Sequence, residues 1–174
     1  AMRGVFLVII CSILMCSCTH RHQHYDYQSA AISMHGGSLK VSVWPSGISH
    51  KNGPPKTTIV ASPYCINLTW GGSERTLHQK VETYVDRIAL ESGALLVVGQ
   101  IGSGTVTINE FYEIEDWSTY FTSGKCGLEI ERHETLRVEG RVVMDEKSEG
   151  FEIILTPKYW QEWRNDTLDG ISSV

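Results

Sequence analysis

The sequence predicts a mainly β fold, an antiparallel sandwich or an open barrel, with one possible helix near residues 74–92. About eight short segments show the alternation of apolar and polar residues that half-buried strands require. Turn-forming residues separate these segments. Predicted strands and helices do not alternate regularly along the chain, so a doubly wound parallel sheet is not expected.

The first predicted strands lie in the N-terminal half of the chain. Apolar residues alternate with polar ones over residues 39–44, which predicts a strand that a proline then ends. Residues 46–56 contain Asn-Gly and Pro-Pro pairs and are expected to form a loop. Strands over residues 57–61 and 64–70 follow, and a Gly-Gly pair ends the second of them.

Residues 74–92 show the spacing of a helix. Ser73 is a good N-cap, and Gly93 stands where a glycine commonly ends a helix. Between them, one helical face would carry Leu77, Val81, Tyr84, Val85 and Ile88. A strand pair is the alternative, because Val81, Thr83 and Val85 occupy alternate positions and are all β-branched, which favours strands.

The second half of the chain contains the remaining predicted strands. They cover residues 94–98, 105–115, 127–131, 136–144 and 151–156. The last two flank a polar connection that ends in glycine, which makes them the clearest hairpin in the chain.

Residues 1–17 have the features of a secretory signal. Arg3 precedes an apolar run from Val5 to Met15, and small residues follow the run. The run is too short to span a bilayer, since about 20 residues are needed. We therefore expect an export signal that is removed.

The end of this segment, Met15-Cys16-Ser17-Cys18, resembles the lipobox of bacterial lipoproteins. The resemblance implies cleavage before Cys18 and acylation of its thiol, so that the mature chain is held on a membrane of the cell envelope. Thr19 follows the cysteine, not the aspartate that commonly retains lipoproteins in the inner membrane. The expected location is the outer membrane, with the protein facing the periplasm.

Composition predicts three parts after the signal. Residues 18–38 are polar and rich in turn formers, and we expect a lipidated cysteine followed by a flexible tether. Residues 39–160 are expected to form a single β-rich domain, and residues 161–174 a polar tail.

The charge of the chain disfavours nucleic acid as a partner. The formal net charge is −5, and no segment is dense in lysine or arginine. For the same reason the sequence predicts no polybasic face for anionic lipid, and membrane attachment is expected to rest on acyl chains.

Two cysteines lie in the expected mature domain, Cys65 and Cys126. An exported protein is folded in an oxidising compartment, so the simplest use of an even pair is one disulfide. A reactive thiol or a metal ligand is the alternative, although neither cysteine lies in a CxxC pair.

No catalytic motif of known spacing occurs in the chain, since HExxH, GxSxG and CxxC are all missing. The alternative function, a hydrolase of cell-wall or polysaccharide substrate, therefore rests on no motif. It would use clustered carboxylates and one histidine: Glu110, Glu113, Asp116 and His133. We predict no enzymatic activity, no cofactor and no metal site.

Three histidines alternate along the expected tether, at His20, His22 and His24. Clustered imidazoles can bind a transition metal, but a flexible segment offers no ordered groups to hold them in place. A solvated spacer is therefore the preferred interpretation.

Aromatic residues give the best indication of function. Trp and Tyr are favoured anchors at protein interfaces because they supply a large rigid surface with a polar end. The candidate partner-binding residues are Trp117, Tyr120, Tyr159, Trp160 and Trp163. The alternative is that these side chains cap the ends of a small β core. The sequence thus predicts a lipid-anchored, non-enzymatic binding or assembly module with a protein partner in the envelope.

Overall fold

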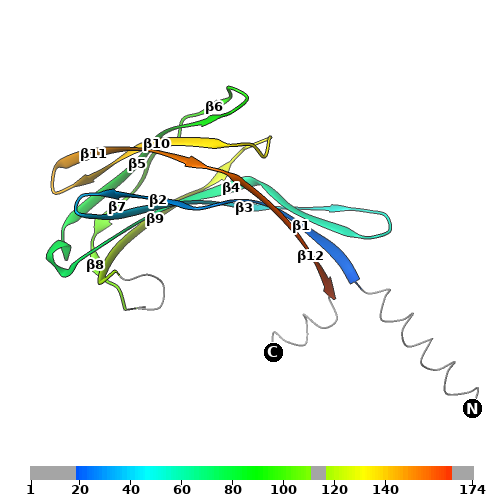
Figure 1. Cartoon of the computed structure of the whole chain (residues 1–174), viewed down its shortest axis with the longest axis horizontal. Coiled ribbons are helices and arrows are strands. Elements are labelled where there is room, and N and C mark those ends of the chain that lie inside the picture. Colours follow the sequence, from blue (N-terminus) through cyan, green and yellow to red (C-terminus); the bar gives the residue numbers. More distant parts are fainter. Residues whose placement is uncertain (1–18, 111–116, 166–174) are drawn as a thin grey trace, which may run out of the picture.

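Two β-sheets pack face to face and enclose the hydrophobic core (Figure 1). The structure is a computed structural model, and it describes residues 19–110 and 117–165. Most neighbouring strands are antiparallel, so the prediction of a mainly β sandwich is confirmed.

The seven-stranded sheet is built around a long central strand. Its order is β12(Pro157–Asn165), β1(Thr19–Tyr27), β4(Thr57–Gly72), β3(Gly37–Lys51) and β2(Ala30–Met34), and β9(Thr119–Leu128) pairs with β4 and β8(Thr107–Ile108) with β9. The five-stranded sheet has the order β11(Lys147–Leu155), β10(Leu136–Met144), β5(Lys80–Leu90) and β6(Leu95–Leu96), and β7(Gly99–Thr105) also pairs with β5.

The core follows from the period of two along the strands. Inward-facing residues of both sheets are fully buried, among them Leu39, Val41, Ile66, Leu68, Trp70, Val81, Val85, Ile88, Leu136, Val138 and Leu155. Burying one such side chain stabilises the fold by about 1.5–3 kcal/mol. The indole nitrogen of Trp70 donates a hydrogen bond to the Met34 carbonyl at 3.1 Å, so its one polar group is satisfied inside the core.

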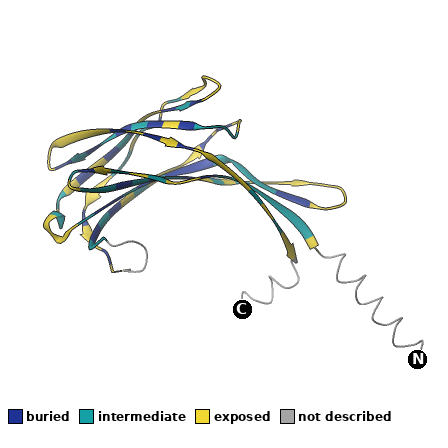
Figure 2. Cartoon of the chain, in the orientation of Figure 1, coloured by how far each residue is buried: buried dark blue, intermediate teal, exposed yellow. Residues whose placement is uncertain are grey.

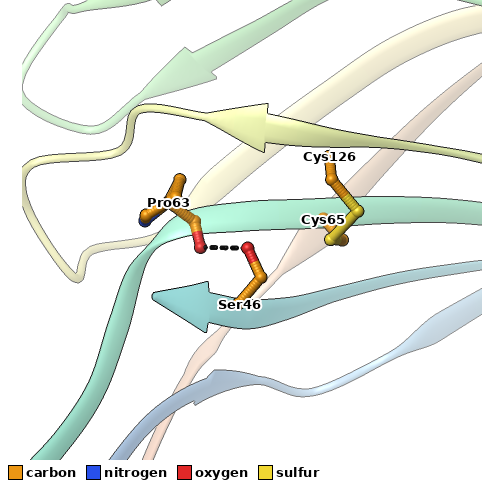
Figure 3. Close-up of a disulfide and its surroundings, with 4 residues drawn as sticks. All are labelled: Ser46, Pro63, Cys65 and Cys126. Atoms are coloured by element: carbon orange, nitrogen blue, oxygen red, sulfur yellow. Dashed lines mark hydrogen bonds between the residues drawn. A yellow bond between two sulfur atoms is a disulfide. The ribbon is translucent and has the colours of Figure 1, made fainter. Parts of the chain in front are cut away.

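The disulfide between Cys65 and Cys126 is present and joins β4 to β9 (Figure 3). The two Cα atoms are 3.9 Å apart. The register of the two strands shifts between Tyr64 and Ile66, and Gly127 supplies the positive φ of 84° beside this bulge. The disulfide therefore fixes the pairing at its least regular point.

Both β3 and β4 change direction at one place. The Ser46 hydroxyl donates a hydrogen bond of 2.7 Å to the Pro63 carbonyl across the two strands (Figure 3). A methyl group added at Gly47 would lie 1.9 Å from the Ser62 carbonyl oxygen, so this close approach requires glycine. Beyond this point the strands leave the sandwich.

We call the part that leaves the sandwich the arm. It consists of β12, β1 and residues 57–61 and 47–51 of β4 and β3. β1 runs parallel to β4 and antiparallel to β12. Figure 1 shows the arm extending away from the five-stranded sheet, and Figure 2 shows that most of β12 is exposed there.

The expected helix over 74–92 is wrong. A short 3-10 turn, η1(Glu74–Thr76), precedes strand β5. The pairing of β5 with β10 carries a bulge beside Asp86, which opposes no residue of β10. Val81, Thr83 and Val85 are therefore buried with a spacing of two, and the next buried residue is Ile88, with a spacing of three. This single bulge produces the spacing that resembles a helical face.

The expected tether and tail also differ from the structure. Residues 19–27 and 30–34, within the expected tether over 18–38, form β1 and β2. Residues 161–165, within the expected tail over 161–174, continue β12. The polar composition of β1 and β12 fits strands of the arm, whose faces lie mostly outside the core, so that alternation of apolar residues is not needed. In β2, by contrast, burial alternates and Met34 is buried in the core.

Other boundaries shift as well. β3 continues to Lys51 through the expected loop, and the strands expected over 57–61 and 64–70 are one strand. The expected strand over 94–98 contains only β6, and that over 127–131 only the end of β9. Of the strand expected over 105–115, Thr107–Ile108 forms β8, whereas residues 111–116 lie outside the described residues.

The hairpin of β10 and β11 is as predicted, with a shorter turn. Its two turn residues, Asp145 and Glu146, have φ values of 45° and 70°. Positive φ at both positions is the type I′ geometry that matches the twist of the flanking strands.

Candidate binding site

The five predicted aromatic residues divide between two places. Trp117 and Tyr120 lie near β8 and β9 at the sandwich, whereas Tyr159, Trp160 and Trp163 lie on β12 in the arm. Trp117 packs on the backbone of β4, since a methyl group added at Gly71 would lie 1.8 Å from its ring. Trp117 and Tyr120 are both half-buried, so they contribute to packing.

On β12, the two most exposed aromatics share one face. Tyr159 is 49 % exposed and Trp163 is 59 % exposed. Trp160 lies on the opposite face, is half-buried and stacks on His24, and its indole nitrogen donates a hydrogen bond of 2.5 Å to the Asp26 carboxylate. Trp160 therefore holds β12 to β1.

We call the face with the exposed aromatics the aromatic face. Its residues from β1 and β12 are Arg21, Gln23, Tyr25, Tyr159, Gln161 and Trp163. The side-chain amide of Gln23 donates a hydrogen bond to the Tyr159 hydroxyl at 3.0 Å. That hydroxyl donates to the side-chain amide oxygen of Gln161 at 3.3 Å. The Tyr25 and Tyr159 rings lie 5.1 Å apart. These contacts fix the orientation of the Tyr159 ring.

The opposite face carries the three histidines of β1. The rings of His20 and His22 stack with centroids 4.7 Å apart, and those of His22 and His24 with centroids 6.2 Å apart. Glu162 lies opposite His22 and approaches the His24 imidazole at 3.5 Å. The histidines are thus half-buried parts of a strand and not a solvated spacer.

The electrostatics of this ladder favour the neutral form of His22. Burial lowers the pKa of His22 from 6.5, and the positive charges of His20, Arg164 and His24 lower it further, against the raising effect of Glu162. Of the residues the structure describes, no three histidine, cysteine or carboxylate side chains are placed to hold a metal ion.

His133 joins the arm to the sandwich. Its ring lies edge-on to Tyr25 and Tyr27, and its Nε2–H donates a hydrogen bond of 2.6 Å to the Asp26 carbonyl. The Tyr64 hydroxyl donates to the Tyr25 carbonyl at 2.9 Å, and burial raises the pKa of Tyr64 to about 12. These contacts of His133 and Tyr64 connect β1 to the sandwich.

None of the remaining predicted site residues lies on the arm in the part of the chain that the structure describes. Glu110 is exposed beside β8. Glu113, Asp116 and Cys18 lie outside the described residues. Within residues 19–110 and 117–165, no helix has the length and apolar character needed to cross a bilayer.

Comparison of the chain with protein families, characterised proteins and solved structures found no match. The sequence predicts Tyr159 and Trp163 as binding candidates, and they stay predictions. It offers no signal for Gln23 and Tyr25, because their pairing with β12 joins opposite ends of the chain.

Proposed function

We propose that this protein is a lipid-anchored, non-enzymatic binding module of the bacterial cell envelope, whose aromatic face holds a protein partner. The lipobox resemblance at Met15-Cys16-Ser17-Cys18 supports the anchor. The periplasmic face of the outer membrane is the proposed location.

The exposure of Tyr159 on the arm is the observation that carries the binding function. A tyrosine that is 49 % exposed yet oriented by Gln23 and Gln161 loses little side-chain entropy on binding. Rigid aromatic anchors of this kind dominate the energetics of many protein interfaces.

The position of β12 at the edge of its sheet also supports a protein partner. β12 pairs with β1 on one side only, among the described strands. Its other side presents backbone donors and acceptors to which an extended segment of a partner can add as a strand. Side-chain and backbone recognition would then act together.

Affinity capture from membranes of the native host, followed by mass spectrometry, tests the proposal. The N-terminal peptide should carry acyl chains on Cys18. Tyr159→Ala should reduce recovery of the partner at least tenfold. Ile154→Ala is the matched control, since Ile154 is 53 % exposed on the five-stranded sheet and should leave recovery unchanged. Equal recovery with Tyr159→Ala would refute the assigned face.

A further inference from the structure

The far end of the arm gathers positive charge from β1, β3, β12 and the connection between β3 and β4. Arg21 on β1 pairs with Thr57 on β4 and with Trp163 on β12, and Lys51 on β3 pairs with the same Thr57. Lys56 lies beside this row, because its carbonyl accepts a hydrogen bond from the Arg21 amide at 3.0 Å. Arg164 follows Trp163 on β12.

Little negative charge opposes these four cations. Among the described residues of the arm, the acidic ones are Asp26 and Glu162. Asp26 lies at the sandwich end of β1, opposite Lys158. Glu162 accepts a hydrogen bond of 2.6 Å from the Arg164 guanidinium. Within the described residues, the end of the arm is therefore basic, in a chain whose net charge is −5.

The most exposed aromatic residue of the arm lies in the same row. Trp163 is 59 % exposed and lies opposite Arg21. Trp is enriched at the level of lipid headgroups, where its ring meets the acyl boundary and its N–H meets water. Arginine and lysine near anionic lipid contribute about 1 kcal/mol each.

The proposed anchor lies next to this row in the chain. Arg21 is three residues after Cys18, which spans at most about 10 Å of extended chain. The headgroup region on each side of a bilayer is about 5–7 Å thick. An acylated Cys18 would therefore bring Arg21, and Trp163 opposite it on β12, to the headgroups.

We propose that the end of the arm, formed by Arg21, Lys51, Lys56, Trp163 and Arg164, is a contact site for the anionic surface of a phospholipid bilayer. The inference rests on the proposed function where it uses the anchor at Cys18. Trp163 then contacts lipid, while Tyr159, nearer the sandwich, serves the protein partner. The contact orients the arm on the membrane, which acyl chains alone cannot do.

The full-length protein, purified from the native host and placed in vesicles with tail-brominated lipids, tests this site. The vesicles contain phosphatidylethanolamine with or without phosphatidylglycerol. Bromine quenches only tryptophans at the membrane. Trp163→Phe should remove the quenched fluorescence, whereas Trp44→Phe, a 41 % exposed control on the sandwich, should not. Arg21→Gln with Arg164→Gln should lessen quenching in the phosphatidylglycerol vesicles alone.

The outcomes separate this inference from the proposed function. An acylated protein whose Trp163 is not quenched would overturn the lipid site and leave the anchor intact. Quenching of Trp163 in a protein without acyl chains would support the lipid site and refute the anchor. A protein that carries no acyl chains and does not bind phosphatidylglycerol vesicles would overturn both the lipid site and the anchor. Circular dichroism checks that each variant is folded.

Discussion

The imidazole of His24 lies parallel to the indole of Trp160, with ring centroids 3.8 Å apart and an interplanar angle of 3°. The two residues are directly opposite on β1 and β12. This stack joins the first described strand to the last and stabilises an arm that the hydrophobic core does not cover.

Trp160→Ala should loosen the arm. It removes the stack with His24 and the hydrogen bond to Asp26, which together are worth about 2 kcal/mol for a half-buried ring. Amide hydrogen exchange along β1 should accelerate about thirtyfold, while exchange in β10 stays unchanged. Trp163→Ala serves as the control, because loss of an exposed ring should change stability by less than about 0.5 kcal/mol. Equal protection of β1 in Trp160→Ala would contradict the role of the stack.

Loss of the disulfide should destabilise the whole sandwich. Cys65 and Cys126 are 61 residues apart in the chain, and closing a loop of that length is worth about 4 kcal/mol in the chain-entropy model. The Cys65→Ser, Cys126→Ser double variant should show this loss in urea unfolding followed by tryptophan fluorescence. Reduction of the wild-type protein should lower its unfolding midpoint in the same way, and an unchanged midpoint would argue against the disulfide.

Acid should weaken the arm before it weakens the sandwich. The pKa of His22 is lowered in the folded protein from 6.5 by burial and by neighbouring positive charge, so the unfolded chain binds a proton more readily. The contribution of neutral His22 to the stability of the arm is fully present above pH 6.5. It is lost as the pH falls through the lowered pKa of His22 in the folded protein. Hydrogen exchange of β1 amides between pH 7 and 5, corrected for intrinsic rates, should reveal the change. In His22→Asn the pH dependence should become smaller, and an undiminished dependence would assign the effect to another group.

Glu146→Gly should stabilise the β10–β11 hairpin. Glu146 has a φ of 70°, which costs little for glycine but strains a residue with a side chain. The resulting Asp-Gly turn suits the type I′ geometry, and the expected gain is about 0.5–1 kcal/mol. Thermal unfolding should shift upward by a few degrees. Glu149→Gly, within β11, is expected to shift it downward, because the glycine adds backbone freedom in a strand and removes the carboxylate that accepts a hydrogen bond of 2.7 Å from the His35 amide.

Much of the sandwich could be predicted because its signals are local. The β10–β11 hairpin and the strand at 39–44 follow from alternation over a few residues and from adjacent turn formers. The disulfide followed from counting cysteines. The helix predicted over 74–92 failed because the bulge beside Asp86 depends on Gly140 of β10, far away in the sequence.

The arm could not be predicted, because its pairings are the least local in the fold. Gln23 and Tyr159 meet across 136 positions of the chain, and β1 pairs in parallel with a strand that begins at Thr57. The polar composition of β1 suggests a tether when β1 is considered alone. A polar segment becomes a strand only when other strands satisfy its backbone hydrogen bonds.

The sequence by itself determined that this chain folds into β-sheets around one apolar core with one disulfide. The alternation of apolar and polar residues and the pair of cysteines can both be recognised without knowledge of the fold. Only the tertiary structure decided that Lys51, Lys56, Arg21 and Arg164 lie at the same end of the arm as Trp163. No stretch of the sequence is basic, yet strand register places these charges in neighbouring rows. Electrostatic potential depends on distances in space, which the spacing of residues along the chain does not reveal.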